Sequence, residues 1–361
     1  MTYYHPNYSR NKKKKHTAFH KLIIYILALL IISAIVIGYL LYTVIYKPNV
    51  WLNEKSQIEI FIPTNSNFED VKTILYENGV IINRKNFEWL AEKKKYPDNI
   101  KAGRFIIKEC LNNDELINLL RIGKNESVKV IFNNVRTIDK LAERISEQIE
   151  ADKESILSLL TDTSFIKKYE KNKRTISTIF IPNTYEFFWN TNAKQFIDRM
   201  YSESKRFWTE ERKAKAEELN MSTNEVITLA SIIEQETSKN DEKSIIAGVY
   251  LNRINKGWKL QADPTLIFAL GNYGIKRVLN EHKEIDSPYN TYKIKGLPPG
   301  PICIPSIASI DAVLNYDKNK YLYFCAKDDL SGYHSFAKTN AQHNRNAKAY
   351  QKALNKMKIW K

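Results

Sequence analysis

In the first half of the chain, short segments in which apolar and polar residues alternate are interspersed with segments whose apolar residues lie three and four positions apart. Residues 58–62 alternate as a half-buried strand does and end at Pro63. Residues 67–78 carry apolar side chains three and four positions apart and end at Gly79, which is typical of a helix and its terminus. The same criteria predict helices over residues 87–94, 114–122 and 138–149 and a strand over residues 128–132. Residues 100–107 predict a turn at Gly103 and then a strand.

The second half consists mainly of predicted helices joined by loops that contain proline and glycine. Residues 151–174 are highly charged and predict a solvated helical hairpin, whereas residues 178–189 predict an extended aromatic segment. Further helices are predicted over residues 195–219, 222–237, 242–256 and 340–357, a strand over 320–326, and loops at 261–265, 286–292 and 296–301. Together these elements predict an α+β fold.

One long apolar run stands apart from this pattern. Residues 22–46 contain no charged side chain, and as a helix they would span about 37 Å, enough to cross a hydrocarbon core of roughly 30 Å. Basic residues precede the run and no acidic residue occurs before Glu54. The positive-inside rule therefore places residues 1–21, a short disordered basic tail, in the cytoplasm and the rest of the chain outside.

A cleaved signal peptide is the alternative interpretation of this run. A signal core is shorter and ends at a site of small residues, and the segment after Gly38 is rich in tyrosine and leucine instead. Tyrosines near both ends of the run match the interfacial anchors of a transmembrane helix. We therefore predict a single uncleaved transmembrane helix over residues 22–46.

Charge and cysteine content narrow the functional classes. The formal net charge of +16 suits acidic partners such as anionic lipid or wall polymers. Nucleic acid is not an expected partner, because no recognition motif accompanies the lysines.

Cys110, Cys303 and Cys325 are too few and too far apart for a disulfide framework. One pair is possible, but three buried free thiols fit better.

No metal or cofactor is expected from the sequence. His16 and His20 are four residues apart, but they lie in the basic tail with no third ligand nearby.

The candidate chemistry centres on Glu234, a carboxylate inside the otherwise apolar helical run of residues 229–237. Ile227 and Ala230 share a helix face with it, being three and four residues apart. Apolar surroundings penalise the ionised form and raise the pKa of a glutamate, so that the carboxyl group stays protonated and can act as a general acid. We therefore predict Glu234 as the catalytic residue.

Two other interpretations of these glutamates are open at this point. Glu234 can equally be a buried structural acid bonded to a backbone amide or to an arginine such as Arg253. Glu236 lies about 200° further around the helix, so the two carboxylates cannot form a catalytic pair. Glu236 fits a structural role better, with a hydrogen bond to a neighbouring loop.

The loops supply candidate ligand contacts. Asp263, Tyr289, Asn290 and Tyr292 lie in segments punctuated by proline and glycine, where ligand-contacting residues concentrate. Tyrosine and asparagine side chains suit sugar hydroxyl and N-acetyl groups. Turn capping and aromatic packing are the alternative for each residue taken singly.

The order of these motifs resembles a known family. Residues 229–237 are followed by residues 247–253, 260–265, 287–292, 296–302, 321–324, 334–336 and 343–344. In this order they are similar to the endolytic murein transglycosylases of the MltG (YceG-like) family. The segments at residues 61–63, 101–103 and 120–123 are similar to the LysM-like subdomain of that family, so the resemblance covers nearly the whole chain. Residues 133–136 depart from the sequence pattern of the family. Ser306 also departs from it, because the family usually has glycine at that position.

The resemblance implies a domain organisation and a set of site residues. A LysM-like αβ subdomain would occupy residues 51–125, a connecting αβ region residues 126–220, and a lysozyme-like catalytic domain residues 221–361. Glu234 would be the acid/base. The residues expected to line the glycan cleft are Gln261, Asp263, Thr265, Tyr289, Asn290 and Tyr292.

The implied reaction needs one carboxylate. A lytic transglycosylase cleaves the MurNAc–GlcNAc bond within a peptidoglycan strand and leaves a 1,6-anhydro-MurNAc end, because the C6 hydroxyl of the sugar attacks. A hydrolase normally needs two carboxylates. The resemblance thus implies an enzyme of the cytoplasmic (inner) membrane that faces the extracytoplasmic side. It would terminate nascent glycan strands beside peptidoglycan synthases.

Two alternatives to this function are kept. A hydrolytic muramidase of the same fold would use Asp263 as its second carboxylate. A non-enzymatic wall-binding scaffold of the peptidoglycan synthesis complex would need neither carboxylate.

Overall fold

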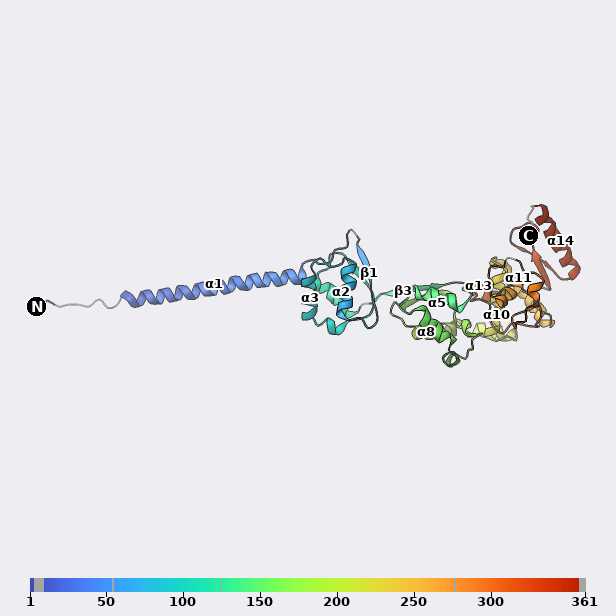
Figure 1. Cartoon of the computed structure of the whole chain (residues 1–361), viewed down its shortest axis with the longest axis horizontal. Coiled ribbons are helices and arrows are strands. Elements are labelled where there is room, and N and C mark those ends of the chain that lie inside the picture. Colours follow the sequence, from blue (N-terminus) through green and yellow to red (C-terminus); the bar gives the residue numbers. More distant parts are fainter. Residues whose placement is uncertain (3–9, 54, 124, 276, 357–361) are drawn as a thin grey trace. The chain divides into compact units, whose positions relative to one another are not determined.

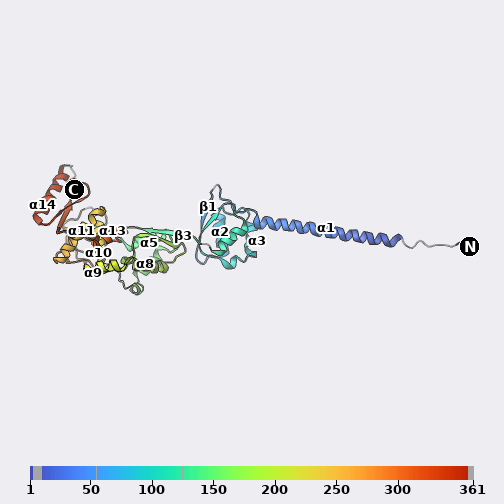
Figure 2. The same ribbon diagram turned by 180° about the vertical axis from the view of Figure 1, so that it is seen from behind.

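The computed structural model describes residues 1–2, 10–53, 55–123, 125–275 and 277–356, and the chain divides into the units Met1–Glu126 and Ser127–Lys361 (Figure 1). Figure 2 shows the same elements from behind. In chain order they are α1 (Arg10–Tyr46), β1 (Gln57–Ile62), α2 (Phe68–Glu77), α3 (Arg84–Lys93), η1 (Pro97–Asn99), β2 (Gly103–Lys108), α4 (Asn113–Ile122), β3 (Ser127–Phe132), α5 (Ile138–Ser146), α6 (Lys153–Thr161), α7 (Thr163–Ile166), η2 (Lys167–Tyr169), η3 (Ile176–Ile179), β4 (Asn183–Phe188), α8 (Ala193–Phe207), α9 (Glu210–Glu218), α10 (Thr223–Glu236), α11 (Asn240–Asn255), α12 (Asp263–Leu270), η4 (Glu281–Glu284), α13 (Ile307–Leu314), β5 (Tyr323–Ala326), β6 (His334–Ala337) and α14 (Asn340–Lys356).

The long helix α1 contains the predicted transmembrane segment. Its stretch Phe19–Tyr46 is long and apolar enough to cross a membrane, and residues 22–46 fall inside it. The prediction of a disordered tail is wrong for residues 10–21, which continue the helix, while residues 3–9 lie outside the described part of the chain. Helix propagation explains the extension, because each added residue gains a backbone hydrogen bond once a helix has formed.

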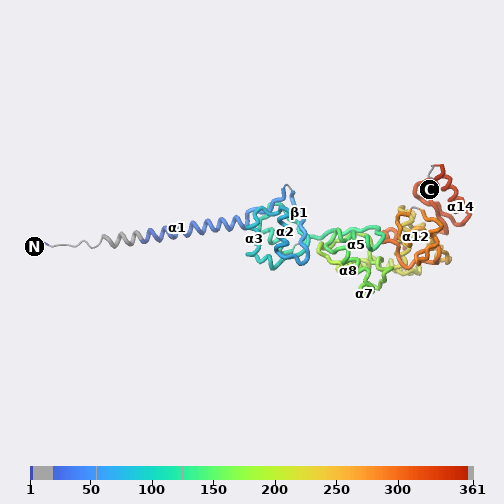
Figure 3. Tube along the Cα trace, in the orientation of Figure 1, coloured from blue at the N-terminus to red at the C-terminus, as the bar shows by residue number. Residues whose placement is uncertain are grey.

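The rest of the first unit is a small αβ body, in which α2, α3 and α4 accompany an antiparallel pair of strands (Figure 3). β1 pairs with β2 from Gln57 opposite Lys108 to Ile62 opposite Gly103. The helices and strands predicted between residues 58 and 122 are confirmed. Each helix begins at an asparagine whose side chain accepts hydrogen bonds from first-turn amides, as N-caps do. These caps are Asn67, Asn83 and Asn112.

The first part of the second unit packs helices against the strand pair β3–β4. β3 runs antiparallel to β4, from Ser127 opposite Phe188 to Phe132 opposite Asn183. The prediction that residues 151–174 form a solvated hairpin is wrong in part, because α6 and α7 bury Ile156, Leu160 and Phe165 in the hydrophobic core. Their charged residues occupy only the outer faces, and apolar residues four apart, such as Ile156 and Leu160, face inward.

The second part of this unit is built around α10, which packs against α11, α12 and α13. α10 buries an unbroken run of eight residues, from Val226 to Ile233. The sequence analysis missed α12, α13 and β6. It assigned the start of α12 to a loop because of Pro264, although proline is favoured in the first turn of a helix.

The predicted α+β class is confirmed by this mixture of helices and short antiparallel strand pairs. The LysM-like and lysozyme-like labels of the subdomains stay predictions.

The cysteines are free thiols, as the sequence favoured, but they are not all buried. Cys303 is buried, Cys325 is half-buried, and Cys110 is exposed in a turn with φ of 63°.

Candidate active site

The last turn of α10 carries the acidic residues that the sequence singled out. The helix begins as predicted, with a capping box in which Ser222 accepts from the amide of Glu225 and the Glu225 carboxylate accepts from the amide of Ser222. It ends at Glu236, so Glu234 and Glu236 lie on its final turn. Being 200° apart around the axis, their side chains enter different environments, as expected.

Glu234 lies in a polar, nearly closed pocket. Its Oε2 accepts hydrogen bonds from Lys243 Nζ at 3.0 Å and from the hydroxyl groups of Ser306 and Ser309 at 2.5 Å each. Its Oε1 accepts from Asn134 Nδ2 at 3.1 Å. The side chains of Glu234 and Lys243 are only 9% and 4% exposed, so this is a buried ion pair.

The predicted elevation of the Glu234 pKa is therefore wrong. Burial raises the pKa of this carboxyl, but the hydrogen bonds from Ser306, Ser309 and Lys243 and the charge of Lys243 outweigh it, and the pKa is lowered. The neighbours on α10 are apolar as inferred, whereas α11 and α13 supply a cation and two hydroxyls. The lowered pKa favours the anionic form of Glu234, whose charge Lys243 balances.

The ion-pair partner of the Glu234 carboxylate is Lys243, not Arg253, the arginine suggested by the sequence. Arg253 donates instead to the backbone carbonyls of Leu260 and Leu322.

Glu236 has the raised pKa that was expected of Glu234. Burial raises the pKa of its carboxyl to about 7, even though the hydroxyl of Tyr250 donates to Glu236 Oε1 at 2.6 Å and stabilises the anion. The negative charge of Asp263 raises this pKa further, and Arg253 opposes it. A carboxyl group whose pKa lies near neutral pH can both donate and accept a proton.

Asp263 and Tyr292 interact electrostatically with Glu236: the charge of Asp263 raises the pKa of Glu236, and the charge of Glu236 raises the pKa of Tyr292. The Tyr292 hydroxyl donates to Asp263 Oδ1 at 2.5 Å. Asp263 is exposed and is the first residue of α12, not a loop residue. Gln261 precedes it, exposed, with φ of 52° and its amide bonded to the Thr291 carbonyl at 3.1 Å.

Thr265 and Asn290 do not face the surface as the glycan-contact prediction requires. Both are fully buried. The Thr265 hydroxyl bonds to the Ala262 carbonyl and pairs with Thr291 Oγ1 at 2.8 Å. Asn290 Nδ2 donates to the carbonyls of Lys283 and Ile285, each at 2.8 Å. These contacts correct the prediction, because buried side chains that satisfy loop backbone groups support the loops and cannot touch a sugar.

Tyr289 is half-buried and packs against Phe268 of α12, with ring centroids 4.7 Å apart. Burial raises the pKa of its hydroxyl. The alternative of aromatic packing therefore accounts for most of its surface.

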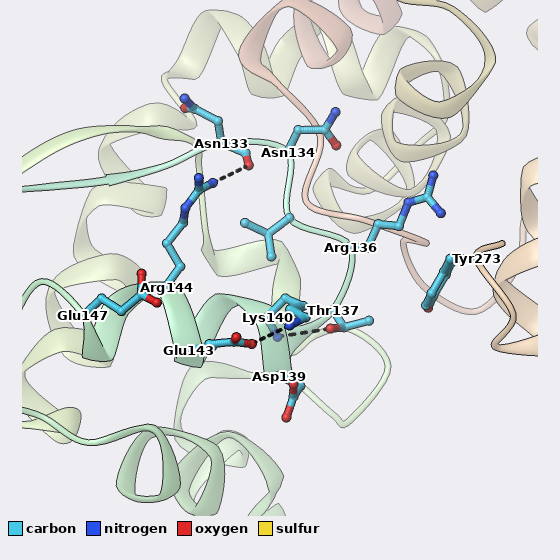
Figure 4. A pocket seen from close by; sticks show the side chains of 11 residues that line it. Asn133, Asn134, Arg136, Thr137, Asp139, Lys140, Glu143, Arg144, Glu147 and Tyr273 are labelled. Atoms are coloured by element: carbon cyan, nitrogen blue, oxygen red, sulfur yellow. Dashed lines mark hydrogen bonds and ion pairs between the residues drawn. The ribbon is translucent and has the colours of Figure 1, made fainter.

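A cavity of about 600 Å³ lies beside this end of α10, between α5, the segment from β3 to α5, and Tyr273 (Figure 4). Arg136 lines it, donates to Gln235 Oε1 at 2.9 Å and lies over the Tyr273 ring at 5.0 Å. A smaller hollow of about 60 Å³ shares Arg136 and Tyr273 and extends to Gln235 and Pro264. Asn134, on the wall of the larger hollow, also donates to Glu234 Oε1.

The sequence analysis did not find Arg136 or Tyr273. The only available signal for Arg136 was that residues 133–136 depart from the family pattern.

Among the residues that the structure describes, no group of three or more His, Cys, Asp or Glu side chains is placed to hold a metal ion.

The raised pKa of Glu236 has a consequence for stability. Between pH 4.5 and 7 the folded chain keeps a proton that the unfolded chain releases, so this group makes stability fall as pH rises through that window. Glu236→Gln removes the titrating carboxyl group and keeps a side-chain oxygen that can accept the hydrogen bond from Tyr250. The variant is therefore expected to melt higher than the wild type at pH 8 and at the same temperature at pH 4.5, measured by differential scanning calorimetry. A difference of equal size at both pH values would contradict the raised pKa.

Comparison with known proteins finds one family model and several relatives that match most of the chain. The model of the YceG-like family matches residues 60–349. An endolytic murein transglycosylase of Bacillus subtilis is 30% identical over 319 residues, covering 84% of this chain and 87% of its own length. One from Streptococcus pneumoniae is 29% identical over 81% of this chain, which spans only 58% of that relative. A crystal structure of a putative YceG-like protein from Listeria monocytogenes, 31% identical, covers 81% of this chain and 99% of its own, with a TM-score of 0.55.

Proposed function

Since this chain belongs to the YceG-like family, we propose that it is a membrane-anchored endolytic lytic transglycosylase. It cleaves the MurNAc–GlcNAc bond within nascent peptidoglycan strands and leaves 1,6-anhydro-MurNAc ends, which terminates strand elongation. The names of the relatives, endolytic murein transglycosylases, support peptidoglycan as the substrate and this class of lyase as the activity.

The assignment of the acid/base role rests on the surroundings of Glu236. Burial and the charge of Asp263 raise the pKa of its carboxyl to about 7, although the hydroxyl of Tyr250 donates to it. We assign the role to this residue in place of Glu234, whose pKa is lowered and whose carboxylate is paired with Lys243. A catalytic acid works best when its pKa lies near the operating pH, because both protonation states are then populated.

The reaction then proceeds with one carboxyl group. Protonated Glu236 donates its proton to the glycosidic oxygen as the bond from C1 of MurNAc to that oxygen breaks. The C6 hydroxyl of the same MurNAc attacks C1, and the Glu236 carboxylate takes the proton of that hydroxyl. The 1,6-anhydro bond forms, the leaving strand carries a free hydroxyl, and the enzyme regains its proton without consuming water.

The side chains proposed to contact the glycan are those that are exposed or half-buried around Glu236: Gln261, Asp263, Tyr289 and Tyr292. Thr265 and Asn290 support these contacts indirectly by bonding the loop backbone. The cavity lined by Arg136 and Tyr273 is proposed to hold sugar units further along the strand, because a smaller hollow that shares these two residues reaches Gln235 and Pro264, the chain neighbours of Glu236 and Asp263.

The stretch Phe19–Tyr46 of α1 is proposed as the membrane anchor, with the basic tail in the cytoplasm and the catalytic domain outside. This topology would keep the enzyme beside strands that emerge from membrane-bound peptidoglycan synthases, its expected partners.

A hydrolytic muramidase is the second candidate, favoured by one observation. Asp263 lies near enough to Glu236 to raise its pKa, and a pair of carboxyl groups is what hydrolysis requires.

The product masses decide between these two reactions. Digestion of uncrosslinked glycan strands by the full-length enzyme is expected to give anhydro-ended fragments, each lighter by one water than the fragment with a reducing end. Asp263→Asn is expected to leave the product type unchanged and to lower the rate only through lost glycan contacts. Reducing ends from the wild type, absent from Asp263→Asn digests, would establish hydrolysis and overturn the transglycosylase proposal.

A further inference from the structure

The junction between α1 and the rest of the first unit contains no free linker. Asn113 Nδ2 donates to the Val44 carbonyl in the last turn of α1 at 2.7 Å. Asn49, three residues after α1 ends, is buried and donates to Asn113 Oδ1 at 2.7 Å and to the Asn83 carbonyl at 3.0 Å. The Asn83 amide in turn donates to Asn49 Oδ1 at 2.6 Å. Hydrogen bonds through the two buried asparagines, Asn49 and Asn113, fix the helix end to the body.

The last turn of α1 is itself part of the packing. Residues 43–45 are half-buried, whereas the rest of the described apolar stretch is exposed, and Ile45 packs on the hydrophobic core of the unit. α1 contacts α3 and α4, and Figure 1 and Figure 2 both show α3 at the end of the body where α1 arrives. α3 therefore lies at the level of the final turn of α1.

Large apolar side chains are exposed around this junction. Trp51 is 54% exposed and Ile82 61% exposed, and both lie on segments bonded directly to the chain that leaves α1. Trp89 on α3 is 40% exposed. Such residues carry a cost in water, and a cluster of them marks a contact surface.

Basic residues accompany this cluster. Lys47, Arg84, Lys85 and Lys93 are exposed on the same segments, and Lys93 Nζ lies 6.0 Å from the centre of the Trp89 ring. Tryptophan with lysine and arginine is the composition that sits at the boundary between lipid and water, where the rings meet the acyl region and the cations meet phosphate.

We propose that the surface formed by Trp51, Ile82 and Trp89 is seated in the phospholipid headgroup layer of the membrane that α1 crosses. This inference rests on the proposed anchoring by α1. The contact partner of this surface is lipid, because the rigid junction holds the surface beside the last turn of the spanning helix. Tyr42 and Tyr46 mark the same depth in the membrane. The first unit would thus lie on the membrane in a fixed orientation.

Quenching of tryptophan fluorescence by brominated phospholipid tests the seating in the full-length chain. The protein is reconstituted into phosphatidylcholine–phosphatidylglycerol vesicles with and without bromine on the acyl chains, and insertion of α1 is checked by flotation after alkaline extraction. Bromine is expected to quench the wild type, and Trp51→Phe with Trp89→Phe is expected to lose most of that quenching. Trp258→Phe is the matched control, since Trp258 is also 40% exposed but belongs to the second unit, and it is expected to retain the quenching.

Two results would refute the location of this surface in the headgroup layer without refuting membrane anchoring by α1. One is an inserted chain whose quenching is unchanged by the Trp51→Phe and Trp89→Phe pair. The other is disulfide formation between copies through Ile82→Cys in a Cys110→Ser background, which would assign the surface to a second copy of the chain. Loss of the protein from the vesicles on alkaline extraction would instead refute the anchor, and the seating with it.

Discussion

Glu236→Gln is expected to lower kcat/KM on uncrosslinked glycan by about 10²- to 10⁴-fold, because an amide cannot donate the proton that the glycosidic oxygen needs. The fold should survive, since the amide oxygen can still accept the hydrogen bond from Tyr250. The rate is measured by the release of anhydro-ended fragments, with circular dichroism to confirm that the variant is folded.

Glu234→Gln is the matched comparison on the same turn of α10. It also replaces a carboxylate by an amide, but it weakens an ion pair with Lys243 and leaves the proposed proton donor in place. Its loss of activity is expected to be smaller than that of Glu236→Gln and to follow its loss of thermal stability. A fully active Glu236→Gln variant beside an inactive, equally stable Glu234→Gln variant would return the catalytic role to Glu234.

The Glu236→Gln variant also tests the alternative of a non-enzymatic wall-binding scaffold. If the protein only bound the wall or the synthesis complex, cells carrying Glu236→Gln would grow and build strands of normal length. Abnormally long glycan strands are expected instead, read from the ratio of anhydro ends to total disaccharide.

Lys243→Ala is expected to cost about 3–5 kcal/mol of stability, because it leaves the buried Glu234 carboxylate without its cation. For a unit of this size the loss corresponds to a melting temperature lower by roughly 2–4 °C per kcal/mol. Since the Glu234 pKa is lowered in the folded state, the pair stabilises the protein above pH 4.5 and the contribution fades as pH falls below that value. The melting-temperature difference is therefore expected to shrink in acid.

An exposed ion pair provides the control. Lys140 and Glu143 are 65% and 42% exposed, and Lys140→Ala is expected to leave the melting temperature nearly unchanged. A Lys243→Ala variant that melted with the wild type at pH 7 would show that the Glu234 network does not hold α10 to α11 and α13.

The sequence predicted the local structure well where local signals are strong. The start of α10 at the Ser222 capping box and the end of α4 at the left-handed Gly123 each depend on residues within four positions, and both helix ends lie where the sequence predicted them. The buried face of α10 also follows from its apolar spacing. The start of α12 was missed because Asp263 and Pro264 suit both a loop and the first turn of a helix.

The chemistry of the site depended on contacts that no local pattern contains. Ser306 and Ser309 follow Glu234 by 72 and 75 residues, and they reach it only because α13 packs against α10. The pKa of Glu236 depends on Asp263, 27 residues away. An apolar helix face around Glu234 suggested a neutral acid, whereas the neighbouring helices make it an anion.

The loop residues show the same limit. Asn290 and Tyr292 belong to one motif, but the first is fully buried against backbone carbonyls while the second is half-buried and bonds Asp263. Residue type and spacing placed both near the site, and only tertiary packing decided which one can meet a ligand.

A direct titration of the two carboxyl groups tests the assignment of the proton donor most sharply. The full-length protein is labelled with ¹³C at the glutamate side-chain carboxyl carbons, and chemical shifts are followed against pH in detergent, with Glu234→Gln and Glu236→Gln used for assignment. A resonance with a midpoint near pH 7 is expected, absent from Glu236→Gln and retained in Glu234→Gln. A carboxyl titrating near pH 7 that vanishes in Glu234→Gln, with Glu236 titrating at or below pH 4.5, would contradict it.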